Sequence, residues 1–275
     1  MIVTSDLIDS MISIEIANLR SRVEGYATRP GNPTGVYVEQ FGVATAFVAE
    51  NIPVRLFNSV LGFGPDTIDH LDQIGEFYAD HGVSEAIEIV PGRMSEAEGI
   101  ELWRRGFAAV EFHTGFAREL GGYAPRPPRP GILVEAIDAA DPVALDRFIA
   151  TDIEGWGGDP TDPDGLANLR TWKRNETWQM FLASIDGEPV GAGVLDIRSD
   201  GAGEIALLAA GSTLPSARGR GVQAALIEAR LAAALEAGCT RAIAGSYFGN
   251  SSMGNLGRAG FSMAFVRAIW VRITR

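Results

Sequence analysis

The sequence predicts an α+β fold, an α/β three-layer sandwich in which two domains each contain a mixed, largely antiparallel sheet flanked by helices. Three observations predict it. A proline-rich segment divides the 275-residue chain near its middle. The second half carries the pattern hairpin, strand, helix, strand, helix, strand. Two short segments of the first half reappear in the second half, in the same order.

The proline-rich segment predicts the domain boundary. Residues 125–131 read PRPPRPG, which places four prolines within six residues. Such a segment continues neither a helix nor a central strand, and it favours an extended, semi-rigid spacer. We therefore expect two domains of ordinary size, residues 1–125 and residues 126–275.

The first elements of the second domain are a helical region and a hairpin. Residues 142–172 are expected to be largely helical. Residues 178–185 (WQMFLASI) and 189–198 (PVGAGVLDIR) alternate as strands, and Asp186-Gly187 between them is a strong hairpin turn signal. Residues 204–210 continue as a buried strand.

A strong helix follows a glycine-rich turn. Ten of the fourteen residues from Ala224 to Ala237 are Ala or Leu, and Gly238 is a natural residue to end the helix. We expect this helix over 222–237. A strand over 240–247, a short helix over 252–259 and a final strand over 263–273 complete the domain.

The first domain repeats this pattern weakly. Residues 81–87 (HGVSEAI) resemble residues 237–243 (AGCTRAI) at an offset of 156. Residues 102–107 (LWRRGF) resemble residues 256–261 (LGRAGF) at an offset of 154. Two matches in one order at nearly one offset indicate that a single domain was duplicated.

Composition excludes several classes of protein. At 46% apolar and 21% charged residues the chain is of the soluble globular class, and its richest apolar stretch, residues 205–210, is too short to span a membrane. A net charge of −12 argues against nucleic acid as a partner. The N-terminus has no basic region of a secretory signal, and the single cysteine, Cys239, excludes a disulfide framework. We expect a cytoplasmic protein with no membrane association and no metal.

The segment most suited to ligand binding is residues 213–225, TLPSARGRGVQAA. A strand ends there, Gly219 and Gly221 follow, and the strong helix begins. The glycines leave backbone N–H groups unshielded, and a helix start adds unpaired N–H groups and about half a unit of positive charge. Together these features predict a site for phosphates. The alternative is an ordinary strand-to-helix turn that needs glycine for its backbone angles.

This segment resembles a known family. Residues 214–221 (LPSARGRG) are similar to the acetyl-CoA loop of the GNAT acetyltransferase superfamily, [Q/R]-x-x-G-x-[G/A], with Gly219 and Gly221 at its two small positions. Ser216 stands where the family usually has Gln or Arg. Residues 255–261 (NLGRAGF) resemble the family's N-x-x-R-x-G-F ending. With the order of strands, the resemblance covers residues 132–273 and identifies the chain as a tandem member with a degenerate N-terminal copy.

The resemblance implies transfer of an acetyl group from acetyl-CoA to a primary amine by direct attack, without a covalent enzyme intermediate. The backbone N–H groups of residues 218–223 would hold the pyrophosphate, and the strand before the loop would pair with the pantetheine arm. The coenzyme-binding residues implied in this way are Thr213, Leu214, Arg218, Gly219, Arg220, Gly221, Val222, Gln223, Ser252 and Asn255. The acceptor is a small-molecule or peptide amine whose identity stays open, as does the oligomeric state.

The catalytic residues are less well marked. Many family members have a tyrosine proton donor at the position of Leu256, and the three histidines all lie in the first domain. Glu204 is the first candidate for a base acting through water, with a solvated strand-start residue as the alternative. Tyr247 is a candidate proton donor to the thiolate, or else a structural tyrosine. Ser252 and Asn255 either touch the coenzyme or cap the short helix.

The first domain lacks the loop. Residues 60–65 (VLGFGP) stand opposite it, with no arginine and with Phe63 and Pro65 at the two glycine positions. We expect this domain not to bind acetyl-CoA. Two other functions stay open for the chain: a non-catalytic acyl-CoA-binding or regulatory module, and a protein that recognises an amine without using CoA.

Overall fold

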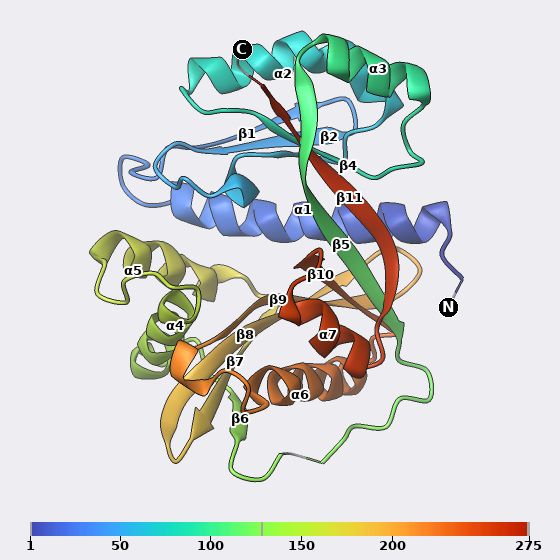
Figure 1. The fold of residues 1–275 in the computed structure, drawn as a ribbon. Helices are drawn as coiled ribbons and strands as arrows, with labels where there is room; N and C mark the ends of the chain where they lie inside the picture. Colours follow the sequence, from blue (N-terminus) through green and yellow to red (C-terminus); the bar gives the residue numbers. More distant parts are fainter. Residues whose placement is uncertain (1, 128, 274–275) are drawn as a thin grey trace. The chain divides into compact units, whose positions relative to one another are not determined.

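A computed structural model describes residues 2–127 and 129–273. The chain forms two compact units (Figure 1). Unit 1 is built from residues 116–263 together with Ile2, and unit 2 combines residues 3–115 with residues 264–273. The predicted boundary after residue 125 therefore lies ten residues beyond the first division, and the second division falls inside the final strand.

Unit 1 contains the elements that the sequence predicts for the second domain. Its sheet has the order β10-β9-β8-β7-β6, in which β9 and β10 are parallel and the other neighbours antiparallel. The elements are β6 (Leu133–Ala136), α4 (Pro142–Gly155), α5 (Pro163–Arg170), η3 (Thr171–Arg174), β7 (Trp178–Ile185), β8 (Glu188–Ser199), β9 (Glu204–Thr213), η4 (Pro215–Ala217), α6 (Val222–Glu236), β10 (Arg241–Tyr247), α7 (Ser251–Arg258) and the start of β11 (Ser262–Arg272).

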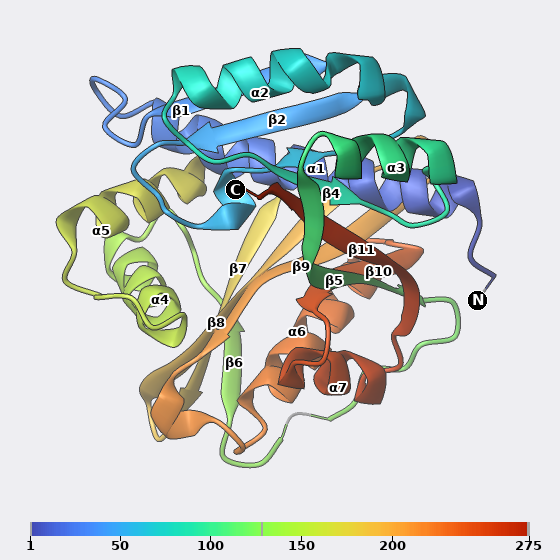
Figure 2. The ribbon, with the colours of Figure 1, turned by 45° about the horizontal axis from the view of Figure 1, so that its top comes forward.

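Helices α6 and α4 cover opposite faces of this sheet (Figures 1 and 2). A Cβ added to Gly211 would meet side chains of α6, whereas the side chain of the next residue, Ser212, lies against Gly155 of α4. Successive residues of a strand point to opposite faces, so the two helices sandwich β9. The apolar core between α6 and the sheet includes Leu195, Ala206 and Leu226. The predicted sheet flanked by helices is confirmed.

Unit 2 has the same plan. Its elements are α1 (Ser5–Ala27), β1 (Val36–Phe41), β2 (Ala44–Ala49), η1 (Arg55–Phe57), β3 (Val60–Leu61), η2 (Pro65–His70), α2 (Leu71–Asp80), β4 (Ala86–Ile89), α3 (Glu96–Arg104) and the first part of β5 (Phe107–Glu119). Helices α2 and α3 cover one face of its sheet and α1 the other (Figure 2). In the chain, β10, α7 and β11 begin 155 residues after β4, α3 and β5, as the repeat predicts.

The last strand of each repeat begins in its own unit and ends in the other repeat's unit. In unit 2, β11 pairs antiparallel with β4, with Ala268 opposite Ile89 and Val271 opposite Ala86. In unit 1, the end of β5 adjoins β10, and the N–H of Leu120 just beyond it bonds to Thr240 O at 2.9 Å. This exchange explains why neither division of the structure falls at the proline-rich segment.

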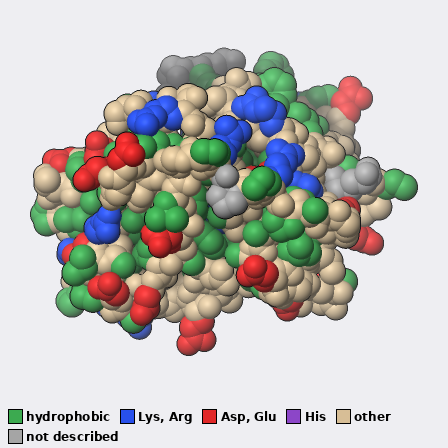
Figure 3. Space-filling model, turned by 90° about the horizontal axis from the view of Figure 1, so that it is seen from below, with side chains coloured by type: hydrophobic (Ala, Val, Ile, Leu, Met, Phe, Trp, Pro, Cys, Tyr) green, Lys and Arg blue, Asp and Glu red, His purple; other side chains and the backbone are tan. Residues whose placement is uncertain are grey.

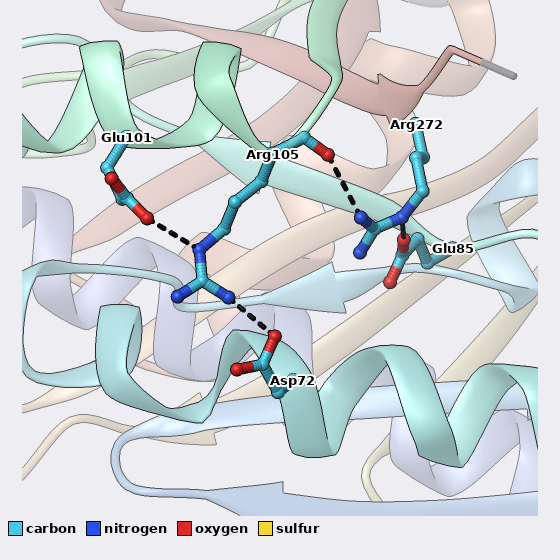
Figure 4. A network of polar contacts seen from close by, with 5 residues as sticks. All are labelled: Asp72, Glu85, Glu101, Arg105 and Arg272. Carbon is cyan, nitrogen blue, oxygen red and sulfur yellow. Dashed lines mark hydrogen bonds and ion pairs between the residues drawn. The ribbon is translucent and has the colours of Figure 1, made fainter. Parts of the chain in front are cut away.

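Polar contacts fix the end of β11 in unit 2 (Figure 4). Arg272 forms an ion pair with Glu85 and donates from Nη1 to the carbonyl oxygen of Arg105 at 2.9 Å. The guanidinium of Arg105 in turn contacts Glu101 at 2.7 Å and Asp72 at 2.6 Å, which ties α3 to α2. Residues near the C-terminus therefore contribute to the packing of the first repeat.

Candidate functional site

Strands β9 and β10 part toward their C-terminal ends. Their recorded pairing covers Arg241 with Ile205, Ala242 with Ala206 and Ile243 with Leu207. Beyond that point β9 runs on to Thr213 and β10 to Tyr247. Backbone groups on the β10 side of β9 are therefore available to an extended ligand over the last part of the strand.

A bulge in β9 lies at this opening. The register with β8 shifts between Ala192 and Val194, and Ala210 has a positive φ of 44°. Glu204 accepts a hydrogen bond from Thr240 on the β10 side, whereas Leu214 donates to Val190 on the β8 side. Residues ten apart face the same neighbour in a regular strand, so one extra residue has been inserted between them.

The bulge changes which residues face the opening. Counting back from Leu214, which faces β8, the alternation turns the backbone groups of Thr213 and Gly211 toward the β10 side. Ser212 faces β8, where it pairs with Ala192. The backbone expected to pair with a pantetheine arm is that of residues 212–214, and of these only Thr213 faces the opening, whereas Ser212 and Leu214 face β8. Gly211, just before them, also faces the opening.

The glycine-rich loop connects this open edge to α6. Gly219 and Gly221 have positive φ angles of 77° and 92°, and Gly221 is the N-cap residue of the helix. The first hydrogen bond of the helix runs from Ala225 N to Gly221 O at 3.0 Å. The N–H groups of Val222, Gln223 and Ala224 consequently have no acceptor within the helix. A helix start with unpaired N–H groups is the arrangement that favours an anion, and the sequence predicts an anion at this point.

Two predicted binding residues use their side chains to hold the loop. Gln223 Nε2 donates to Ser212 O at 2.8 Å and to Thr213 Oγ1 at 3.0 Å. Arg218 Nη2 donates to Gly155 O, at the end of α4, at 3.3 Å, and its Nε reaches Thr213 O at 3.4 Å. Both side chains are therefore engaged with protein, and of the two residues only Gln223 keeps a backbone N–H without a partner in the loop or helix.

The 3-10 turns of the loop also engage two backbone donors. The N–H of Arg218 points to Pro215 O and that of Arg220 to Ala217 O, each at the long distance of 3.4 Å. The side chain of Arg220 is exposed. The best-placed donors are accordingly those of Gly219 and of the first turn of α6.

Arg129, which sequence reasoning assigned to a spacer, lies at this loop. A Cβ placed on Gly221 would be 2.7 Å from its Nη1. Nearby, Tyr123 OH donates to Glu228 of α6 at 2.7 Å, and Arg126 lies 3.6 Å from the same carboxylate. The segment before β6 therefore runs along α6 toward its N-terminus. Figure 3 shows basic side chains gathered on the face of the molecule seen from below.

A buried arginine, Arg230 of α6, supports the bulge from behind. Its Nη1 donates to Val194 O at 3.2 Å and to Ala209 O at 3.1 Å, and its Nε donates to Leu226 O at 3.1 Å. It is 2% exposed, and burial lowers the pKa of its guanidinium to about 10. A Cβ on Gly193 would lie 3.0 Å from Cζ, so a side chain there would require the guanidinium to shift.

The two predicted catalytic residues lie at opposite ends of the sheet. Glu204 is the exposed first residue of β9, nine residues from Thr213, which is roughly 30 Å along a strand. Tyr247 is the last residue of β10, 49% exposed, at the end where the strands part. Tyr247 thus lies at the end of the sheet where the loop begins, and Glu204 lies at the other end.

Helix α7 is capped by a residue that the sequence did not single out. Asn250 Oδ1 accepts from Met253 N at 3.2 Å, as an N-cap residue does. Asn255 Oδ1 accepts from Arg258 Nη2 at 2.7 Å, and Ser252 lies half-buried in the first turn. The capping alternative for Ser252 and Asn255 is therefore not what the structure contains. Leu256 is buried.

A carboxylate that the sequence analysis missed lies on α4. Asp152 is buried one turn before Gly155, on the face of the helix that packs against β9. The signal is in the sequence: Leu145, Phe148, Ile149 and Asp152 have helical spacing, and the acid stands alone among apolar residues.

The loop equivalent in unit 2 has a different structure. β3 is two residues long and is followed by the 3-10 helix η2 instead of an α-helix. The N–H of Gly64 points to Thr67 Oγ1 at 3.4 Å, and Thr67 N donates back to Gly64 O at 2.9 Å. Phe63 is buried in the core. This turn satisfies its own donors, so it offers little to an anion.

Two kinds of feature are absent from residues 2–127 and 129–273. No group of three or more His, Cys, Asp or Glu side chains in these ranges is arranged to hold a metal ion. No helix in them combines the length and the apolar composition needed to cross a bilayer. The three histidines, His70, His81 and His113, all lie in unit 2, where their rings contact Gln73, Glu50 and Glu111.

Comparison with known proteins shows which family model and which solved structures this chain is similar to. The model of the acetyltransferase (GNAT) family matches residues 146–261. No curated protein matches the chain. Among solved structures, the chain is similar to a GCN5-related N-acetyltransferase from Kribbella flavida, with 18% identity, 96% of each chain covered and a TM-score of 0.64. A second GCN5-related N-acetyltransferase, from Sphaerobacter thermophilus, is 15% identical. The match covers 98% of this chain and 93% of that chain, with a TM-score of 0.60.

A tandem GNAT protein from the clavulanic acid biosynthesis pathway is similar over the whole chain. It has 13% identity, 100% of this chain and 98% of that chain are covered, and the TM-score is 0.65. At such identities the likeness shows the fold, which is the tandem GNAT fold. The family match and the fold together support acyl transfer in general.

Proposed function

Because residues 146–261 form a domain of the acetyltransferase (GNAT) family, we propose that this protein is an N-acetyltransferase that transfers an acetyl group from acetyl-CoA to a primary amine. The observation that carries the proposal is the continuity of the site. The open edge of β9 leads directly into the loop whose glycines precede the unpaired N–H groups of α6. A thioester with a long amide-bearing arm and a pyrophosphate matches both parts.

The coenzyme would lie along this path with its phosphates at the helix. The N–H groups of Gly219 and of residues 221–224 would hold the pyrophosphate, with help from the helix dipole and the guanidinium of Arg129. The backbone of Gly211 and Thr213 would pair with the amides of the pantetheine arm. The thioester then reaches the bulge at Ala210, where the strands part.

The reaction needs no covalent intermediate on the protein. The ammonium of the acceptor gives a proton to a base, and its nitrogen attacks the thioester carbon to form a tetrahedral intermediate with an oxyanion. The C–S bond breaks as this intermediate collapses, and the nitrogen loses its second proton as the amide forms. Coenzyme A leaves as a thiolate that takes up a proton. We keep Glu204 as the base, connected to the amine by a chain of ordered waters, because six residues of β9, roughly 20 Å of strand, separate it from the bulge at Ala210. Tyr247, at the open end of β10, is assigned as the proton donor.

A second function has a specific observation in its favour. Leu256, at the family's tyrosine position, is buried and carries no proton to give. A non-catalytic acyl-CoA-binding module would have the same coenzyme site without turnover. The acceptor that we propose for the enzyme is a small-molecule or peptide amine, with no nucleic acid or membrane involved, and we place the protein in the cytoplasm.

Calorimetric titration of the intact protein with acetyl-CoA, and then with free CoA, tests the proposal. We expect one site per chain, because the turn of unit 2 satisfies its own donors. CoA release, followed with a thiol reagent over a panel of polyamines, aminoglycosides, amino acids and short peptides, then separates an enzyme from a binding module. An absence of binding at millimolar acetyl-CoA would remove both functions.

A further inference from the structure

Arg230 is a buried cation without an acidic partner. Its three recorded hydrogen bonds all go to backbone carbonyl oxygens, and its pKa is affected by burial alone. Among the described residues no carboxylate forms an ion pair with it. A buried charge that is not neutralised in this way is costly, and structures rarely retain one without a use.

The position of Arg230 indicates that use. It binds the carbonyl oxygen of Ala209, the residue just before the bulge, at 3.1 Å. Because the peptide bond between Ala209 and Ala210 is trans, the N–H of Ala210 points away from the guanidinium. By the alternation that begins at Glu204, that N–H faces the side on which β10 has parted.

We propose that Arg230 is a positioning residue that polarises the Ala209–Ala210 peptide, so that the N–H of Ala210 becomes a stronger hydrogen-bond donor to the carbonyl oxygen of a bound thioester. The inference rests on the proposed function and adds to it a residue outside the coenzyme loop. Since hydrogen bonds in a chain polarise one another, a full charge at one end of a peptide strengthens the donor at its other end. The stronger hydrogen bond would stabilise most the oxyanion that forms when an amine attacks the thioester, because that oxygen carries a full negative charge.

A structural role makes a different prediction. If Arg230 only fills the space left by Gly193 and satisfies carbonyls freed by the bulge, any side chain that bonds to these carbonyls should serve. Glutamine retains a donor without the charge, and lysine retains the charge with a different shape. The pair Arg230→Gln and Arg230→Lys therefore separates charge from hydrogen bonding, and Arg230→Met removes both.

The test uses the intact protein with acetyl-CoA labelled with ¹³C at the thioester carbonyl, and no acceptor. Isotope-edited infrared difference spectra report the strength of the hydrogen bond to that carbonyl. We expect a band shifted to lower frequency in the wild type and in Arg230→Lys, and a smaller shift in Arg230→Gln and Arg230→Met at saturating coenzyme. With an amine substrate, kcat should fall about tenfold in the uncharged variants while coenzyme affinity changes little.

Arg170→Met is the matched control, because it removes an equal charge from an exposed ion pair with Asp146 in the same unit. Its band should stay at the wild-type position. A band that is unchanged in Arg230→Gln overturns the role of Arg230, and so does an equal loss in Arg230→Lys and Arg230→Gln. If Arg230→Met does not fold, the comparison of Arg230→Gln with Arg230→Lys alone tests the role of Arg230. A wild type that binds no acetyl-CoA would instead refute the proposed function, and the inference with it.

Discussion

Arg129 lies against Gly221, so that a Cβ on this glycine would come within 2.7 Å of the guanidinium Nη1. One residue belongs to the proline-rich segment and the other to the N-cap of α6, 92 positions later in the chain. The contact brings a full positive charge to the point where the helix offers unpaired N–H groups. The proposed anion site of unit 1 therefore combines a helix terminus with a side chain.

Replacing Arg129 should weaken coenzyme binding. Arg129→Ala is expected to raise the Kd for acetyl-CoA about tenfold, since a charge-assisted hydrogen bond contributes about 1.5–3 kcal/mol at most sites. The difference in affinity between the wild type and Arg129→Ala should be smaller at high salt, because salt screens the charge of Arg129. Calorimetry at two ionic strengths measures it, and Arg126→Ala in the same segment, whose partner is Glu228, is the control. Equal affinities for both variants would remove Arg129 from the site.

A side chain at Gly221 should abolish coenzyme binding. Gly221→Val places a Cβ on a residue with a φ of 92° and drives it into Arg129. Gly238→Val imposes a similar strain at the other end of α6, where φ is 80° and a Cβ meets open space. We expect both variants to lose similar stability and only Gly221→Val to lose acetyl-CoA. Binding at wild-type affinity in Gly221→Val would refute the loop assignment.

The general base can be assigned by comparing two carboxylates. Glu204→Gln should lower turnover by a factor of about 10² or more with little change in coenzyme affinity, as expected when a base is lost. Asp152→Asn, which alters the buried acid of α4, should have a smaller effect. The rate of CoA release at saturating amine measures both. A full rate in Glu204→Gln together with a slow Asp152→Asn would transfer the role to α4.

Unit 2 should depend on a residue of the last strand. Arg267 of β11 forms ion pairs with Glu15 at 2.6 Å and with Glu88 at 2.8 Å, and all three are shielded from solvent. Arg267→Met leaves two buried carboxylates without a partner, which should cost about 3–5 kcal/mol at pH 7. Arg20→Met removes an exposed arginine paired with Glu24 and should cost less than about 1 kcal/mol.

The effect of Arg267→Met should grow with pH. Burial raises the pKa of Glu15 even beside Arg267, which opposes the shift. Without Arg267 the folded-state pKa rises further above the unfolded value, so the folded variant binds more protons than its unfolded chain. The variant is therefore most stable at low pH, and it loses stability as pH rises from the unfolded-state pKa of Glu15 through its folded-state pKa. Urea unfolding at pH 4.5 and pH 7 measures the difference, and an equal cost at both would contradict it.

The loop and the helices of unit 1 were predictable because their causes are local. Gly219 and Gly221 require positive φ angles, and an Ala- and Leu-rich run forms a helix wherever it packs. The turn at Asp186-Gly187 follows from the same conformational preferences, and both residues have the positive φ that such a turn needs. Each of these features depends on residues within about one turn of each other.

The bulge and its support were not predictable in the same way. Nothing in the neighbourhood of Ala210 marks it as the inserted residue, because the extra position exists only relative to β8. Arg230 reads as one more polar residue of a helix until β9 and β8 bring their carbonyls to it. Asp152 continues the helical spacing of the apolar residues of α4, which can be seen in the sequence. Only the packing of α4 on β9 shows that this carboxylate is buried beside the strand.

The sequence by itself determined the kind of elements, their order, the repeat and the glycine-rich turn before α6, since short-range sterics and periodicity set these. Only the tertiary structure decided which strand completes which sheet, and it gave β11 to unit 2 and the end of β5 to unit 1. It also brought Arg129 to Gly221 and separated Glu204 from the loop. The physical reason is that pairing between strands and burial of charge depend on partners distant in the chain, which local propensity does not specify.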